Sequence, residues 1–478
     1  MKATRIFSLL LAMLMLGACV AACDTVGGKE TTQAPTEEPT EAPTQAPTDE
    51  PTAEPTEEPT TEATTEQTTE EPTTEEETTR GTVNTDPIGD ILEYGKYDLN
   101  TYMTPIWDGR VVYNETVMFV GMDDKASLLY TPDEILSVRS YDLKTEYEKG
   151  KDYDVVDGQL VLLEGTRIPV ISLEQYYHEK EIAGMPAQLV TKYEGKNYYT
   201  YWGEGTTMTK WQVAVTYVHD QYWEGFMPET SDQFTKLIAK LEAGEDVTMF
   251  FYGDSITFGA TSSSGANVAP YAPPYTQMFT QYLAQKYGYT IKYVNTGLDN
   301  TATPPTKDTV FGTNGTITYI NTAVGGWTSA DGFNKFDQYV TPYIEQYKCD
   351  FFALAFGMND AGNSPSTEKK AIKKITDKIY EVAPEVELLL VSTMIPNPEA
   401  TNGWYGNQYR FENVFEQLAK AYVEEGKSCG VACMTSMSQR IVENKRFRDH
   451  TGNNINHPND FLGRIYAQVV FETVIGYD

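Results

Sequence analysis

One serine of the sequence lies where a nucleophile could be activated. Ser255 stands in Gly253-Asp254-Ser255, directly after the apolar run 247–252, which predicts a buried strand. A serine hydroxyl attacks a carbonyl carbon only when a neighbouring base takes its proton. The N–H group of a residue at the start of a helix can also face a developing oxyanion. Gly-Asp-Ser occurs in ordinary turns as well, so the tripeptide needs partners elsewhere in the chain.

Two further turns follow predicted strands and could supply oxyanion donors. Gly326 comes five residues after Asn321, which ends one predicted strand, and Asn359 follows the apolar strand 351–356. Glycine lets a backbone N–H approach a substrate closely, and an asparagine amide can donate a hydrogen bond to an oxyanion. The same residues also fit plain structural roles, a turn with positive φ and a helix cap.

His457 is the candidate for the general base. The chain has four histidines, of which His178 and His219 lie in a β-rich part where structural roles are favoured. His457 is followed by a proline at the start of the last predicted helix, which fixes the local backbone and suits a positioned base. His450 is a lesser candidate.

The order of these four motifs resembles the four-block signature of the SGNH (GDSL-type) hydrolases. The resemblance covers about residues 247–475 and implies a flavodoxin-like parallel sheet. It also implies that Ser255 is the nucleophile, that His457 is the base, and that Gly326 N–H and the Asn359 side chain form the oxyanion hole with Ser255 N–H. No Gly-x-Ser-x-Gly elbow surrounds Ser255, so the α/β-hydrolase interpretation fails.

This chain differs from the family at the position of the usual catalytic acid. Its members place an aspartate two or three residues before the histidine, where this chain has Ile455 and Asn454. The chain resembles family-two carbohydrate esterases, which join a jelly roll to an SGNH domain and use a Ser–His dyad helped by a backbone carbonyl. We therefore expect a neutral acceptor, Asn454 or a main-chain carbonyl, to orient His457. Asp449 is the alternative if its loop folds back.

The glycine block has two candidate copies. Gly297 follows Asn295 at the end of one predicted strand, and Gly326 follows Asn321 at the end of the next. The family spacing favours Gly326, because Gly297 comes too early after its asparagine. The segment between the copies is then a loop at the rim of the site.

Predicted strands and helices alternate along the C-terminal half of the chain, and they must position these residues. Strand-like apolar runs near 247–252, 291–295, 317–321, 351–356, 388–392 and 430–434 are separated by amphipathic helices such as 367–380, 411–424 and 460–474. This alternation predicts a parallel sheet covered on both faces, which binds ligands beyond the carboxyl ends of its strands. We assign residues 230–478 to a three-layer α/β/α SGNH hydrolase domain. Residues 81–229, with short alternating strands and turn signals, predict a jelly-roll-like β-sandwich.

The first 80 residues predict export rather than a folded domain. Lys2 and Arg5 precede a short apolar run that ends in Leu-Gly-Ala-Cys19, which resembles the lipobox of bacterial lipoproteins, with Cys23 as a second candidate. We assign residues 1–23 to this signal peptide. Residues 24–80 repeat Thr, Pro and Glu with almost no apolar side chains and predict a disordered linker. The sequence thus predicts a protein lipid-anchored to the outer face of the bacterial membrane.

Charge and cysteine content narrow the classes of function. The formal net charge is -33, which argues against nucleic-acid binding, and 15 of the acidic residues lie within 31–80. The three cysteines left after the signal peptide have no zinc-like spacing, and neither a metal nor an organic cofactor is expected.

The sequence predicts an extracellular serine esterase that removes acyl groups, acetyl above all, from a polysaccharide. A lipase or lysophospholipase and a surface carbohydrate-binding protein with a degenerate hydrolase domain are the alternatives.

Overall fold

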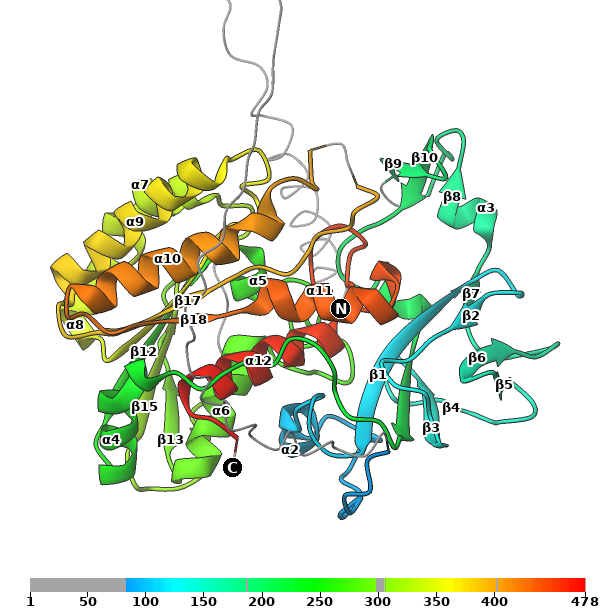
Figure 1. Ribbon diagram of the computed structural model, residues 1–478, viewed down its shortest axis with the longest axis horizontal. Helices are drawn as coiled ribbons and strands as arrows, with labels where there is room; N and C mark the ends of the chain where they lie inside the picture. The colour runs from blue at the N-terminus through cyan, green and yellow to red at the C-terminus, as the bar shows by residue number, and fades with distance from the viewer. Residues whose placement is uncertain (1–82, 186–187, 298–304, 306, 401–402, 478) are drawn as a thin grey trace, which may run out of the picture. The chain divides into compact units, whose positions relative to one another are not determined.

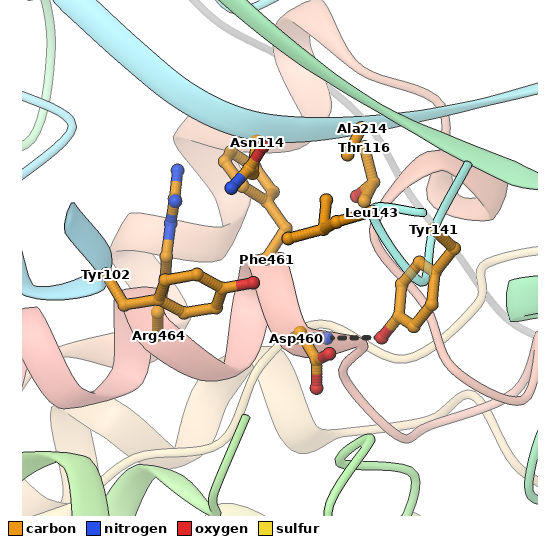
Figure 2. A pocket seen from close by; sticks show the side chains of 9 residues that line it. All are labelled: Tyr102, Asn114, Thr116, Tyr141, Leu143, Ala214, Asp460, Phe461 and Arg464. Carbon is orange, nitrogen blue, oxygen red and sulfur yellow. Dashed lines mark hydrogen bonds between the residues drawn. The ribbon is translucent and has the colours of Figure 1, made fainter. Parts of the chain in front are cut away.

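The computed structural model describes residues 83–477, apart from 186–187, 298–304, 306 and 401–402. The predicted signal peptide and linker lie outside the described residues. The described residues belong to the unit Thr78–Asp478 and form a sheet-rich N-terminal region followed by an α/β region (Figure 1). None of the described helices is long and apolar enough to cross a bilayer.

The α/β region is built on a seven-stranded sheet with the order β14-β13-β15-β12-β16-β17-β18. Neighbouring strands are parallel except β14, which pairs antiparallel with β13. The chain leaves the central strand β12 on one side and later crosses it to the other, so the carboxyl end of β12 is where such sheets bind ligands. The strands are β12 (Val247–Gly253), β13 (Thr290–Tyr293), β14 (Thr309–Val310), β15 (Thr316–Asn321), β16 (Phe351–Ala355), β17 (Glu387–Val391) and β18 (Cys429–Ala432).

Helices cover both faces of this sheet because its strands are apolar on both faces. Side chains alternate along a strand, so Phe250 and Tyr252 face one helical layer while Met249 and Phe251 face the other. Figure 1 shows α7, α9 and α10 on one side of the sheet and α6 and α12 on the other, which confirms the predicted three-layer architecture. The helices are α4 (Thr235–Ala243), α6 (Tyr275–Tyr287), α7 (Ser329–Tyr339), α8 (Thr341–Tyr347), α9 (Pro365–Val382), α10 (Phe411–Glu424), α11 (Met434–Asn444) and α12 (Asp460–Val474).

The described residues of the N-terminal region form three sheets, so this region, predicted to be a jelly-roll-like β-sandwich, is sheet-rich. Their orders are β4-β3-β11-β1-β7, β2-β6-β5 and β8-β10-β9. Residues 111–120 form one strand, which passes through an irregularity at Asn114 (φ 45°) and continues in the same sheet. The elements are α2 (Leu99–Met103), β1 (Val111–Val120), β2 (Lys125–Ala126), β3 (Glu134–Ser140), β4 (Glu146–Tyr147), β5 (Tyr153–Val156), β6 (Gln159–Leu162), β7 (Val170–Ile171), α3 (Leu173–Tyr176), β8 (Tyr177–His178), β9 (Gln188–Tyr193), β10 (Lys196–Tyr201) and β11 (Gln212–Val218).

The two regions share one apolar core, which holds a buried ion pair. The core runs from β1 and β11 to α6 and α12 without interruption. Within this junction Lys445 Nζ, just after α11, lies 2.6 Å from Glu115 Oε1 of β1, and both side chains are fully buried. Glu115 also accepts hydrogen bonds from Leu129 N–H and the Tyr217 hydroxyl. The buried Glu115 carboxylate thus has its full set of hydrogen-bond and ion-pair partners only when Lys445 is present.

Replacing Lys445 by methionine should therefore destabilise the protein strongly. The variant leaves the Glu115 charge buried and unpaired, which typically costs about 3–5 kcal/mol. The free energy of unfolding in urea measures the loss. Adding Glu115→Gln to Lys445→Met should recover much of the lost stability, because it removes the orphaned charge.

The matched control is Lys151→Met, which breaks a pair with Glu148 in which both side chains are 60% exposed. Such surface pairs contribute about 0–1 kcal/mol. Equal losses in the two single variants would contradict the importance of the buried pair.

Candidate active site

Ser255 stands at the turn from β12 into the short helix α5 (Ser255–Phe258). The Asp254 side chain caps this helix by accepting the N–H of Ile256 at 3.0 Å. A Cβ on Gly253 would collide with the carbonyl oxygen of Ala355 in the neighbouring strand, so this position needs glycine. The Gly-Asp sequence thus builds a tight strand-to-helix turn that places Ser255 beyond the carboxyl end of the central strand.

The imidazole of His457 meets this serine. His457 Nε2 lies 2.8 Å from Ser255 Oγ, and both side chains are nearly buried. The turn before the histidine is held by Asn453, whose Oδ1 accepts the N–H groups of Ile455, Asn456 and His457 at 2.9–3.0 Å. The geometry therefore allows a proton to pass from the serine hydroxyl to Nε2.

The other ring nitrogen faces a carboxylate from the N-terminal region. His457 Nδ1 lies 3.0 Å from Glu204 Oε2, in the loop after β10. Burial alone would lower the pKa of His457, but the charge and hydrogen bond of Glu204, together with the charge of Asp254, outweigh it and raise the pKa above its usual value. Desolvation would raise the pKa of Glu204, but the attraction and hydrogen bond of His457 lower it below 4.5. By contrast, burial raises the pKa of Asp254 to about 7, so Glu204 is the better-ionised neighbour of the ring near neutral pH.

The two residues expected to orient His457 lie elsewhere, and this expectation is corrected. Asn454 has φ 68°, and its amide bonds the Tyr176 hydroxyl and the Tyr201 carbonyl instead of the ring. Asp449 accepts the N–H of Met118 and pairs with Arg446. Although burial would raise the pKa of Asp449, Arg446 lowers it to about 2. Both residues therefore hold the two regions together, and the imidazole meets a charged acceptor rather than a neutral one.

The two oxyanion candidates follow strands that flank β12. β15, which leads to Gly326, and β16, which leads to Asn359, are the neighbours of β12. Gly326 has φ 81° and is exposed, a backbone conformation that favours glycine. Asn359 Nδ2 donates to Trp327 O at 2.9 Å, which ties the asparagine to the glycine turn. The alternative Gly297 follows β13, which lies one strand farther from β12.

The turn before Gly326 is fastened to the serine turn and to the asparagine turn. Val324 N–H donates to Gly253 O at 3.1 Å. The Ser329 N–H and hydroxyl donate to the Asp360 carboxylate, so Asp360 joins the start of α7 to the turn that carries Asn359. These contacts bring the four sequence motifs to one end of the sheet.

The sequence interpretation missed both Glu204, which faces the histidine ring, and Asn453, which holds the histidine backbone. Glu204 lies 253 residues before His457, in a Gly-Glu-Gly stretch between two strands of the other region. No local spacing or periodicity links the two positions. The only signal was indirect, since the missing aspartate before His457 implied that some other group faces Nδ1.

One protein family and several solved structures are similar to parts of this chain. Residues 251–461 match the GDSL-like Lipase/Acylhydrolase family, and no curated protein matches the chain. Similar solved structures include a two-domain esterase active on acetylated mannans, with 18% identity, a TM-score of 0.36 and coverage of 52% of this chain and 54% of that one. An acetyl xylan esterase has 18% identity, a TM-score of 0.33 and coverage of 48% and 100%. A carbohydrate acetylesterase from Sinorhizobium meliloti has 14% identity, a TM-score of 0.29 and coverage of 47% and 96%.

The match spans about half the length of the two-domain esterase. The family match begins inside β12, at the strand that leads to Ser255, and it ends just after His457, at the start of α12. It therefore encloses all four motifs together with the strands that position them. Within the α/β region of this chain, residues 251–461 are similar to the hydrolase domains of the GDSL-like Lipase/Acylhydrolase family.

Proposed function

We propose that the protein is a serine ester hydrolase that removes short acyl groups, acetyl above all, from a carbohydrate polymer. The observation that carries the proposal is the 2.8 Å contact between Ser255 Oγ and His457 Nε2 at the carboxyl end of the central strand. Serine and imidazole at this distance form the minimal unit of acyl transfer.

The chemistry follows from the positions of these groups. His457 Nε2 takes the hydroxyl proton while Ser255 Oγ attacks the ester carbonyl carbon. The N–H groups of Ser255 and Gly326 and the Asn359 amide donate to the resulting oxyanion. When the intermediate collapses, the alkoxide of the sugar leaves with the proton from Nε2, and the acyl group stays on Ser255. A water molecule, deprotonated by His457, then attacks the acyl-enzyme and releases the free acid and the serine.

Ser255→Ala and His457→Ala should each lower kcat on an activated acetyl ester by about 10⁴-fold or more, because they remove the nucleophile and the base. Asn359→Ala should lower kcat by about 10²–10³-fold, the usual loss for one oxyanion donor. Steady-state kinetics on p-nitrophenyl esters measure these losses. Ser366→Ala, at an exposed serine of α9, is the control that should keep full activity.

The acyl group and the class of protein are tested with the same preparation. Turnover that falls steeply from acetyl to long-chain esters supports the proposal. Preference for long chains would favour a lipase or lysophospholipase instead. No turnover of any ester would favour the non-catalytic binding protein.

A partly exposed tryptophan near the oxyanion turn supports a sugar-containing substrate. Trp404, 36% exposed, lies in the loop between β17 and α10. The Gln408 amide donates to Trp404 O at 2.8 Å and to Met358 O at 3.0 Å, which fastens this loop beside Asn359. A partly exposed indole on a loop whose backbone is held in this way can stack on a sugar ring. Trp327 suits this role less, since it is half-buried and packs edge-on to Tyr339.

Trp404→Ala should raise KM for an acetylated polysaccharide roughly 2- to 10-fold, which corresponds to the ~0.5–1.5 kcal/mol of an aromatic pair. The kcat/KM on p-nitrophenyl acetate should stay unchanged, because this substrate has no sugar ring. Trp404→Phe is the control and should keep most of the affinity. A parallel loss on both substrates would contradict a role in sugar binding.

We also propose that the protein is exported and anchored by a lipid on Cys19. The support is the lipobox-like sequence before Cys19 and the polar Thr/Pro/Glu tract that follows it. A stalk of this composition would hold the hydrolase away from the membrane and toward a polymeric substrate.

Cys19→Ala should abolish incorporation of a labelled fatty acid by cells that produce the protein, whereas Cys23→Ala should retain it. The thiol of the cysteine at the cleavage site accepts the lipid, and alanine has no thiol. The reverse result would move the anchor to Cys23. Label retained in the double variant would contradict a lipoprotein anchor.

A further inference from the structure

We infer that the N-terminal region completes the catalytic centre by supplying, through Glu204, the carboxylate that positions His457. This inference deepens the proposed acyl transfer and rests on it. Glu204 lies three residues after the last residue of β10, whereas Ser255 and His457 belong to the α/β region. The proposed triad is therefore divided between two parts of the chain.

Both oxygens of the Glu204 carboxylate have partners in the histidine turn. Oε2 lies 3.0 Å from His457 Nδ1, and Oε1 accepts the Asn453 amide at 3.0 Å. The Asn453 oxygen meanwhile accepts the His457 N–H. Because backbone donors occupy this oxygen, the amide must turn its nitrogen to Glu204. One side chain thus fixes the histidine backbone and the carboxylate that faces the ring.

The docking of the N-terminal region brings Glu204 to this place. Asn454, at the position where the family resemblance implies an aspartate, donates to Tyr201 O at 2.9 Å and accepts from the Tyr176 hydroxyl at 3.0 Å. Gly203 N–H donates to Asn453 O at 3.3 Å. Two of these bonds, at Tyr201 and Gly203, lie just before Glu204 in the sequence. The residue in the usual acid position therefore holds the loop that carries the replacement carboxylate.

A carboxylate on Nδ1 has two consequences for the reaction. It keeps the proton on Nδ1, so that the lone pair of Nε2 points at the Ser255 hydroxyl. It also stabilises the imidazolium that forms when Nε2 takes the serine proton, while Glu204 itself stays ionised. The Glu204 side chain is 54% exposed, so solvent screens its charge. We therefore expect a smaller effect than the roughly 10⁴-fold of a buried triad aspartate.

Glu204→Gln in the full chain tests this positioning role. The amide cannot hold Nδ1–H in the same way, so kcat on p-nitrophenyl acetate should fall about 100-fold with little change in KM. The pH profile provides a second readout. His457 must be neutral to act as a base, and Glu204 raises its pKa. Without this charge the pKa falls, so the acid limb of kcat/KM should move to lower pH.

Two further variants separate positioning from folding. Glu204→Asp keeps the charge on a side chain one methylene shorter and should recover part of the lost kcat and the wild-type acid limb. Glu174→Gln removes an exposed carboxylate from α3 of the same region and should change neither quantity. Thermal unfolding of all three variants tests whether each of them is folded.

The outcomes distinguish this inference from the proposed function. Wild-type kcat and an unmoved acid limb in Glu204→Gln, together with an inactive Ser255→Ala, would overturn the role of Glu204 and leave the esterase intact. Equal losses in the Gln and Asp variants with an unmoved acid limb would also overturn it, because they indicate a merely structural residue. Full activity in Ser255→Ala would overturn the proposed function itself.

Discussion

The amide of Asn453 is the group on which the geometry around His457 depends. Its oxygen gathers three backbone N–H groups and closes the turn that leads to His457. Its nitrogen donates to Glu204 in the other region. A turn of this kind has few backbone bonds of its own, so without the side chain its N–H groups would lack partners in a buried place. This amide thus helps to hold the turn that places the ring 2.8 Å from Ser255 Oγ.

Charged contacts as well as neutral ones join the N-terminal region to the α/β region at this end of the molecule. Arg446 pairs with Asp449 and Asp124, and Lys445 reaches Glu115 inside the shared core. Buried ionic groups are costly to separate from their partners. The N-terminal sheets are therefore held against the α/β region by interactions that favour one relative placement, as a loop that delivers a side chain to a histidine requires.

Local patterns in the sequence were sufficient for much of the fold. The helices Phe411–Glu424 and Asp460–Val474 begin and end where the sequence predicted, because helical periodicity is a local signal and the Asn459 side chain caps the second helix. The parallel strands were recognisable as short apolar runs buried on both faces.

The candidate site was predictable only as far as its spacing is local. Each of the four candidate residues follows a strand or precedes a helix, so the topology alone places them at one edge of the sheet. These residues are Ser255, Gly326, Asn359 and His457. Asn454 was misjudged because its place in the sequence suggested contact with the ring, whereas φ 68° turns its side chain the other way. Glu204 depends on how two regions dock, and a single sequence contains no direct record of that packing.

The 253-residue separation of Glu204 and His457 has a consequence for the history of such chains. Recombination exchanges modules freely when each carries its own working parts. Here a different N-terminal region would leave His457 without the Glu204 carboxylate. A different hydrolase domain would lack the Asn453 turn that binds Glu204. Under the arrangement inferred above, the two regions are inherited as a pair, and changes at residues 203–204 and 453–454 must accompany one another.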